Sequence, residues 1–310
     1  MADAPAARRY LDPVVLSQLD TLELRARLIV EGFMTGLHRS PYHGFSVEFA
    51  EHRPYNPGDE LRHVDWKVYA KTDRYYIKQY EEETNLRNYI VLDTSSSMRY
   101  QGDGPVSKLD YGAYLAAGLH NLMLTQRDAT GLIGFDEALH TVRPPKATPG
   151  YLRQLLVALE QMHQREADAA RTGAAAALED VARRIKRRSL VVVITDLFEN
   201  VAAHDDLLRA LRHLRHRGHE VIVFHVLEGH TERQFRFPER PMLFRDVETG
   251  EEVRLQPAQV RDHYTEAVEH FTETFRRSCL EHDIDFAELD TDTPYDTALL
   301  AYLNKRSRLA

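Results

Sequence analysis

The stretch Tyr89–Met98 reads Y-I-V-L-D-T-S-S-S-M, and the rest of the chain is organised around it. Its first four residues are apolar with high β propensity, and an acid, a threonine and three serines follow directly. This pattern predicts a buried strand that ends in an oxygen-rich loop. In an open α/β sheet, ligands bind beyond the carboxyl ends of the strands, so we expect Asp93, Ser95 and Ser97 to lie at a binding edge.

Downstream of this stretch, segments with strand character alternate with segments of helical periodicity. Such alternation predicts an α/β fold with a mostly parallel sheet, helices on both faces and one antiparallel edge strand after a turn at Asp136-Glu137. A β-hairpin insertion is expected at about 240–256. The remaining strands are expected at 129–135, 138–142, 190–194, 221–227 and 284–289, and the helices at 108–125, 149–162, 172–186, 205–217, 257–280 and 294–303.

The N-terminal region, residues 1–85, differs in character from the α/β domain expected over 86–310. Residues 13–33 have helical periodicity, whereas 36–74 mix Gly, Pro, His and Tyr with charges and show no sustained period. Within the latter, residues 54–66 read P-Y-N-P-G-D-E-L-R-H-V-D-W, and we interpret them as a structural clamp around a Pro-Gly turn. We therefore expect a helical and wrapping extension followed by one α/β domain.

Composition narrows the classes of function. The chain has 310 residues and a net charge of −8, which provides no overall attraction to nucleic acid or to an anionic membrane surface. Cys279 is the only cysteine, which excludes an intrachain disulfide and fits a reducing compartment. The longest aliphatic run, 190–194, is too short to span a bilayer, and the first residues lack a signal peptide's apolar segment. The sequence predicts a cytoplasmic protein with no membrane span.

Three loops with oxygen ligands are expected to meet at the carboxyl edge of the sheet. The first is the D-x-S-x-S pattern of Asp93, Ser95 and Ser97; the second holds Thr172, just before an alanine-rich helix; the third holds Asp196, after the aliphatic strand at 190–194. Thr148 is the alternative for the second loop. Carboxylates and hydroxyls without imidazole or thiolate favour Mg²⁺, with Mn²⁺ or Ca²⁺ also suited.

These residues resemble a known motif. D-x-S-x-S, a later threonine and a later aspartate form the metal-ion-dependent adhesion site of von Willebrand factor A domains, which matches Asp93, Ser95, Ser97, Thr172 and Asp196. Together with R-P-Y-N-P-G-D-E-L-R-H-V-D-W at 53–66, the chain resembles the bacterial "domain of unknown function 58" family, whose members have a von Willebrand A-like domain. Adhesion sites usually place glycine after the last aspartate, where this chain has Leu197.

The resemblance implies a function. Relatives are associated with MoxR-type AAA+ ATPases in chaperone-like or maturation work. By that analogy the chain is a non-enzymatic, metal-dependent protein-interaction module. Ser95, Ser97 and Thr172 would supply hydroxyl ligands, and Asp93 and Asp196 carboxylates, directly or through water. An acidic side chain of a protein partner, the ATPase or its client, would take the open coordination position.

Other interpretations of the same residues stay open. Ser and Asp cap helices well, so D-x-S-x-S alone could serve only local structure. A Mg²⁺-dependent phosphohydrolase of the haloacid dehalogenase type also places an aspartate after its first core strand, but a second acid follows two residues later, where this chain has Ser95. A third alternative is a scaffold that binds its partner without any ion. The sequence has no Walker A motif and no G-x-G-x-x-G.

Overall fold

The computed structural model describes residues 21–37, 52–54, 76–78, 86–148, 150–165, 173–197, 204–246 and 250–307. The chain divides into two units, one made of 1–36 and 86–310 and the other of 37–85. In the smaller unit, β1 (His52–Pro54) pairs antiparallel with β2 (Tyr76–Lys78). The whole P-G-D-x-x-R-x-x-D-W segment, residues 57–66, lies outside the described residues.

The larger unit is built on a six-stranded sheet of order β10-β7-β6-β3-β4-β5. All neighbours in it are parallel except β5, which runs antiparallel to β4 at one edge. This arrangement confirms the expected fold class. The strands are β3 (Arg87–Asp93), β4 (Ala129–Phe135), β5 (Leu139–Lys146), β6 (Leu190–Thr195), β7 (Glu220–Leu227) and β10 (Asp285–Asp290).

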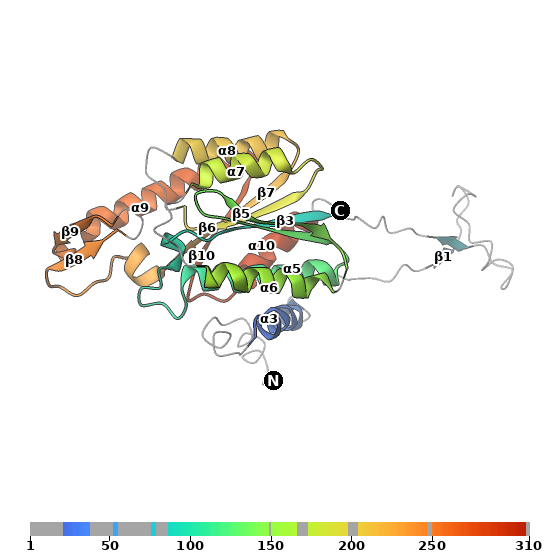
Figure 1. Ribbon diagram of the computed structural model, residues 1–310, viewed down its shortest axis with the longest axis horizontal. Coiled ribbons are helices and arrows are strands. Elements are labelled where there is room, and N and C mark those ends of the chain that lie inside the picture. Colours follow the sequence, from blue (N-terminus) through green and yellow to red (C-terminus); the bar gives the residue numbers. More distant parts are fainter. Residues whose placement is uncertain are drawn as a thin grey trace. The chain divides into compact units, whose positions relative to one another are not determined.

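Helices cover both faces of this sheet (Figure 1). Helices α5 (Lys108–Thr125) and α6 (Tyr151–Gln164) lie on one face, and α10 (Asp296–Ser307) is joined to α5 by the stacking of Tyr295 on Tyr111, with ring centroids 4.4 Å apart. The opposite face is covered by α7 (Ala174–Arg184), α8 (His204–His216) and α9 (Pro257–Leu280). Short turns of helix, η2 (Ser97–Arg99) and η4 (Gly229–Arg233), follow β3 and β7.

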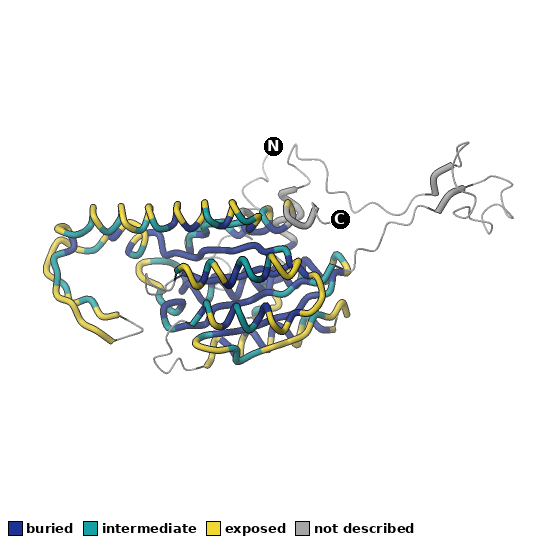
Figure 2. Tube along the Cα trace, turned by 90° about the horizontal axis from the view of Figure 1, so that it is seen from above, coloured by how far each residue is buried: buried dark blue, intermediate teal, exposed yellow. Residues whose placement is uncertain are grey.

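The core forms because successive strand residues point to opposite faces. In β3, Val91 packs into the cluster shared with α7, α8 and α9, while Leu92 lies beneath Gly112 of α5. Every residue of β6 is buried, as expected for a parallel strand covered on both faces. Figure 2 shows the same pattern, with buried strands between helices whose outer faces are exposed.

The expected hairpin insertion is confirmed as β8 (Met242–Arg245) paired antiparallel with β9 (Glu252–Leu255). Aromatic rings connect the hairpin to α9. The ring centroid of Phe244 lies 5.6 Å from that of Phe235 and 4.9 Å from that of Phe237. The ring centroid of Phe235 in turn lies 4.4 Å from that of Tyr264 in α9. Across the described ranges, every helix is too short or too polar to cross a membrane.

Candidate metal centre

Strands β3 and β6 lie side by side at the centre of the sheet, where the order of strands reverses. Chain connections leave β3 towards β4 on one side, whereas β6 continues to β7 on the other. Loops that diverge in this way open a crevice at the carboxyl ends of the two strands, which is where ligands bind in doubly wound sheets. Asp93 ends β3 and Asp196 directly follows β6, so the fold brings both aspartates to this switch point.

Asp93 is fully buried, and both of its carboxylate oxygens are held. The backbone N–H of Ser95 donates to Oδ1 at 3.0 Å, and the hydroxyl of Thr195 donates to Oδ2 at 2.7 Å. The second contact joins β3 to β6 through side chains. Burial raises the pKa of Asp93 to about 7, and the negative charge of Asp196 adds to that rise against the hydrogen bonds from Ser95 and Thr195.

Ser95 and Ser97 are brought together as expected. Both are buried, and their Oγ atoms lie 3.1 Å apart, with Ser97 at the start of η2. This separation is that of a hydrogen bond. It is also close to the roughly 3.0 Å between two oxygens that occupy neighbouring positions of an octahedral Mg²⁺ shell with bonds of about 2.1 Å.

Asp196 is buried and held through its backbone as well as its side chain. Its carbonyl oxygen accepts a hydrogen bond from Nε2 of His225 on β7 at 3.0 Å. Burial lowers the pKa of His225 to about 4, so this ring is neutral near pH 7. The residue after Asp196, Leu197, has φ of 54°, in the left-handed region that favours glycine. The backbone here thus adopts a conformation that glycine takes without strain, although the residue is leucine.

The second loop is only partly described. Thr172 lies outside the described residues, so its predicted role as a ligand stays a prediction. The next residue, Gly173, donates its N–H to the carbonyl of Asp136 at 3.1 Å, just beyond the carboxyl end of β4. The alternative, Thr148, follows the end of β5. Because β5 is antiparallel and its Lys146 pairs with Thr130 at the start of β4, Thr148 lies at the amino ends of the parallel strands, away from their carboxyl ends. Thr148 is therefore not part of this centre.

Two charged residues that sequence reasoning missed complete the centre. Lys108, the first residue of α5, is fully buried, and its Nζ lies 2.7 Å from Oδ2 of Asp196 and 2.5 Å from Oε1 of Glu232 in η4. Burial alone would lower the pKa of Lys108, but the two carboxylates outweigh it and hold this pKa above its usual value. Residues 108, 112 and 115 lie on one buried helix face, so helical spacing could have shown that this lysine needs a counter-charge.

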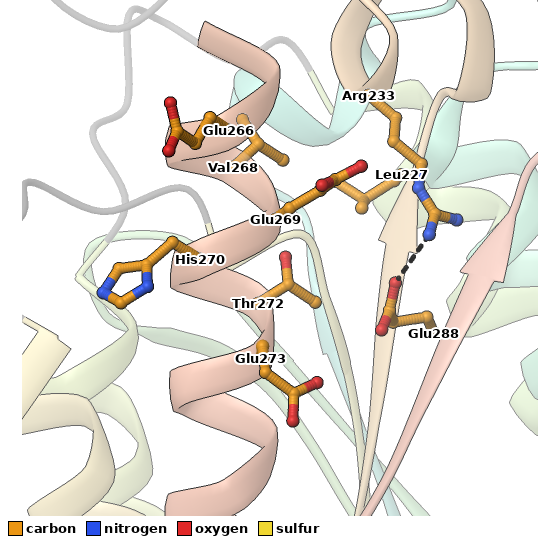
Figure 3. A pocket seen from close by; sticks show the side chains of 9 residues that line it. All are labelled: Leu227, Arg233, Glu266, Val268, Glu269, His270, Thr272, Glu273 and Glu288. Carbon is orange, nitrogen blue, oxygen red and sulfur yellow. Dashed lines mark ion pairs between the residues drawn. The ribbon is translucent and has the colours of Figure 1, made fainter. Parts of the chain in front are cut away.

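The turn that carries Glu232 is held at both ends. At its start, the carboxylate of Glu228 accepts hydrogen bonds from the N–H groups of His230 at 3.1 Å and Glu232 at 3.2 Å. At its end, Arg233 forms an ion pair of 3.4 Å with Glu288 of β10. Figure 3 shows this pair at the wall of a pocket of about 490 Å³ between α9 and strands β7 and β10. Glu232 is thus presented to Lys108 by an anchored segment.

The donor set fits a hard divalent cation. Two buried carboxylates and two buried hydroxyls meet at the switch point, and oxygen ligands of this kind suit Mg²⁺, Mn²⁺ and Ca²⁺. Within the described ranges, no three His, Cys, Asp or Glu side chains gather as a metal-binding group. Such a centre would therefore depend on the serine hydroxyls as well as on Asp93 and Asp196.

The sheet order with its antiparallel edge strand, together with the oxygen-rich loop after β3, defines a von Willebrand A-like α/β protein. More specifically, the chain belongs to the family described as "Protein of unknown function DUF58", whose sequence model matches residues 51–274. The uncharacterized protein Mb1516 of Mycobacterium bovis is 27% identical over 302 residues, which cover 96% of this chain and 91% of that protein. The uncharacterized protein Rv1480 of Mycobacterium tuberculosis matches to the same extent.

Solved structures with similar chains include the conserved hypothetical protein BatB from Bacteroides thetaiotaomicron. It has a TM-score of 0.49 and 18% identity, and the match covers 72% of this chain and 99% of BatB. The SpRpn10 VWA domain has a TM-score of 0.37 and 14% identity, and the match covers 69% of this chain and 93% of that domain.

Proposed function

We propose that this chain is a protein-interaction module whose docking site is a divalent cation held at the switch point of the sheet. Asp93, Ser95, Ser97 and Asp196 would hold the ion, with Thr172 as the ligand expected from the second loop. The observation that carries the proposal is that two buried carboxylates, Asp93 at the end of β3 and Asp196 just after β6, interact at the sheet edge that also holds the paired serine hydroxyls.

The charge balance supports a bound cation. Asp196 and Glu232 share the ammonium of Lys108, and the negative charge of Asp196 also acts on the buried carboxylate of Asp93. Uncompensated buried charge is costly, so such a group favours either a proton or a further cation. One divalent ion would balance the excess negative charge. Burial is the main cause of the raised pKa of Asp93, and the charge of Asp196 adds to it.

The chain's own residues would prepare this site before any partner arrives. Thr195 and the N–H of Ser95 orient the carboxylate of Asp93, and His225 fixes the backbone at Asp196. When bound, the ion supplies an open coordination position that a Glu or Asp of another protein can fill. Because Asp93 and Ser95 are almost fully excluded from water, that carboxylate would bind in a poorly screened environment.

The partner we propose is a MoxR-type AAA+ ATPase or its client, on the basis of the family resemblance.

We propose no catalytic activity, since the position two residues after Asp93 is Ser95, whose hydroxyl faces Ser97 and cannot act as the general acid of a phosphohydrolase. A screen with generic phosphate esters in Mg²⁺ checks this point directly: turnover that disappears in Asp93→Asn would favour the hydrolase.

Calorimetric titration with Mg²⁺ and Mn²⁺ tests the proposed site. The wild type should bind one ion, and the double variant Asp93→Asn with Ser95→Ala should lose that binding while keeping its fold. Asp262→Asn, an exposed change on α9, is the control for loss of a carboxylate. Co-precipitation of the ATPase from the same genome, with Mg²⁺ and with chelator, then tests the partner. Ion binding that is equal in the wild type and the double variant would overturn the proposal.

A further inference from the structure

A lysine ammonium lies at the centre where a metal ion would be expected. Lys108 has no exposed surface, and its Nζ is 2.7 Å from Asp196 and 2.5 Å from Glu232. We infer that Lys108 is a built-in cation that competes with the divalent ion for Asp196 and so sets the metal affinity of the centre. This inference rests on the proposed function for the place where the ion binds.

The ammonium and a divalent ion would compete for the same carboxylate, that of Asp196. An ammonium at 2.7 Å from a carboxylate oxygen makes a short charge-assisted hydrogen bond, which engages that oxygen. A divalent ion needs carboxylate oxygens at about 2.1 to 2.6 Å, and the ammonium repels it at short range. Metal binding at Asp196 must therefore displace the ammonium or share the carboxylate with it.

The buried position of Lys108 is not explained by stability alone. A fully buried ion pair gains little stability, because the cost of removing both charges from water offsets their attraction. Lys108 nevertheless lies on the inner face of α5, where Gly112 and Leu115 of the same face are buried in the apolar core. A charged residue at such a position is better explained by the charge that it supplies to Asp196 than by packing.

Glu232 affects the same competition, because its carboxylate also binds the ammonium of Lys108. Its carboxylate is held in place by the N–H of Glu228 at 3.0 Å and draws part of the positive charge of Lys108 away from Asp196. Removing the charge of Glu232 should therefore weaken metal binding, whereas removing that of Lys108 should strengthen it. Effects of opposite sign from two contacting residues would not follow from a general loss of stability.

Mn²⁺ titration, followed by the paramagnetic resonance of the free ion, tests this inference on the full chain. Lys108→Met should bind Mn²⁺ about tenfold more tightly than the wild type, and Glu232→Gln should bind it several-fold more weakly. Arg233→Met makes the same change of charge as Lys108→Met one residue from Glu232, but Arg233 pairs with Glu288, so its effect should stay within about twofold. Lys108→Gln repeats the measurement with a polar side chain should the methionine variant fail to fold.

The outcomes separate this inference from the proposed function. Tighter binding by Lys108→Met and Lys108→Gln supports the inference, whether or not the wild type binds. If only the variants bind, and an added Asp93→Asn abolishes that binding, the lysine replaces the metal in the native protein and the proposed metal dependence is wrong. Wild-type binding that is unchanged or weakened in both Lys108 variants would overturn the inference and leave the proposed function intact. Absence of binding in all of them overturns both.

Discussion

His120 lies in the middle of α5 with no exposed surface. Its Nδ1 is 2.7 Å from the hydroxyl of Thr130 on β4, and burial lowers the pKa of His120 to about 3. The ring is therefore neutral in the folded protein between about pH 5 and 7. In the unfolded chain a histidine takes up a proton near pH 6.5.

This difference predicts how stability depends on pH. Between about pH 6.5 and 3 the unfolded chain binds a proton at His120 and the folded chain does not, so the free energy of unfolding falls as pH is lowered through this range. The loss should reach about 1.4 kcal/mol per pH unit below pH 6. Urea unfolding at pH 7, 6 and 5 should show a shallower dependence for His120→Asn. The same exchange at exposed His270 is the control, and equal pH dependence in the wild type and His120→Asn would contradict the assignment.

At the residue scale, sequence reasoning placed four of the candidate ligands after apolar strands, because a polar residue after a buried strand stands out. Asp93, Ser95, Ser97 and Asp196 lie at the expected edge. It missed Lys108 and Glu232, since their role depends on a contact between α5 and η4 that spans 124 positions. Charged residues at helix starts and in turns are also common for local reasons, so only the burial of the ammonium distinguishes Lys108.

At the scale of elements, α3 (Leu22–Leu37) packs closely on α5. A Cβ placed on Gly118 would lie 2.7 Å from Cγ2 of Ile29, which is fully buried. The guanidinium of Arg25 lies 4.3 Å from the ring centre of Tyr114 on the same face of α5. Gly118 thus allows two helices that are far apart in the sequence to approach each other.

Substituting Gly118 tests this contact. Gly118→Val should lower the free energy of unfolding by about 1–3 kcal/mol, because Ile29 would have to move. Gly150→Val is the matched control, since a Cβ on Gly150 meets nothing within 4 Å. Chemical denaturation provides the values, and adding Ile29→Ala to Gly118→Val should cost less than the two single changes together. Full additivity would show that the two residues do not touch.

The bounds of elements were predictable where a local signal marks them. Helix α5 begins after Ser107, whose side chain accepts the N–H of Asp110, and α9 begins at Pro257, so both match the expected ranges. The expected strand at 138–142 is longer in the structure: β5 runs to Lys146 through Pro144 and Pro145. Proline is tolerated there because β5 is an edge strand, a position that the sequence alone does not reveal.

At the scale of the whole molecule, the hairpin of β8 and β9 forms a two-stranded sheet of its own, separate from the six-stranded sheet. Its outer ends meet, since Met242 pairs with Leu255. Its Phe244 contacts Phe235 and Phe237 of the segment after η4, and Phe235 in turn contacts Tyr264 of α9. Replacing 242–255 by a short Gly-Ser linker should leave cooperative unfolding and change Mn²⁺ affinity by less than about twofold, because the centre lies at β3 and β6. Loss of cooperative unfolding would show that the hairpin belongs to the core.

The alternation of strands and helices predicted the class of the fold, because each apolar segment must be buried between layers. It did not predict the order of strands in space, which depends on long-range packing. The sequence predicts the N-terminal region as one extension over 1–85. Of its described residues, α3 packs on α5, while β1 and β2 lie in the smaller unit of 37–85. The sequence did not predict that α3 packs on α5, because the contact of Ile29 with Gly118 joins residues that are 89 positions apart.

Calorimetric titration with Mn²⁺ measures directly whether a divalent ion binds between Asp93 and Asp196. We expect one bound ion per chain for the wild type and for Asp262→Asn, and no binding for Asp93→Asn with Ser95→Ala, when both variants melt as folded proteins. Equal binding by the wild type and the double variant, or no binding by the wild type, would contradict this expectation.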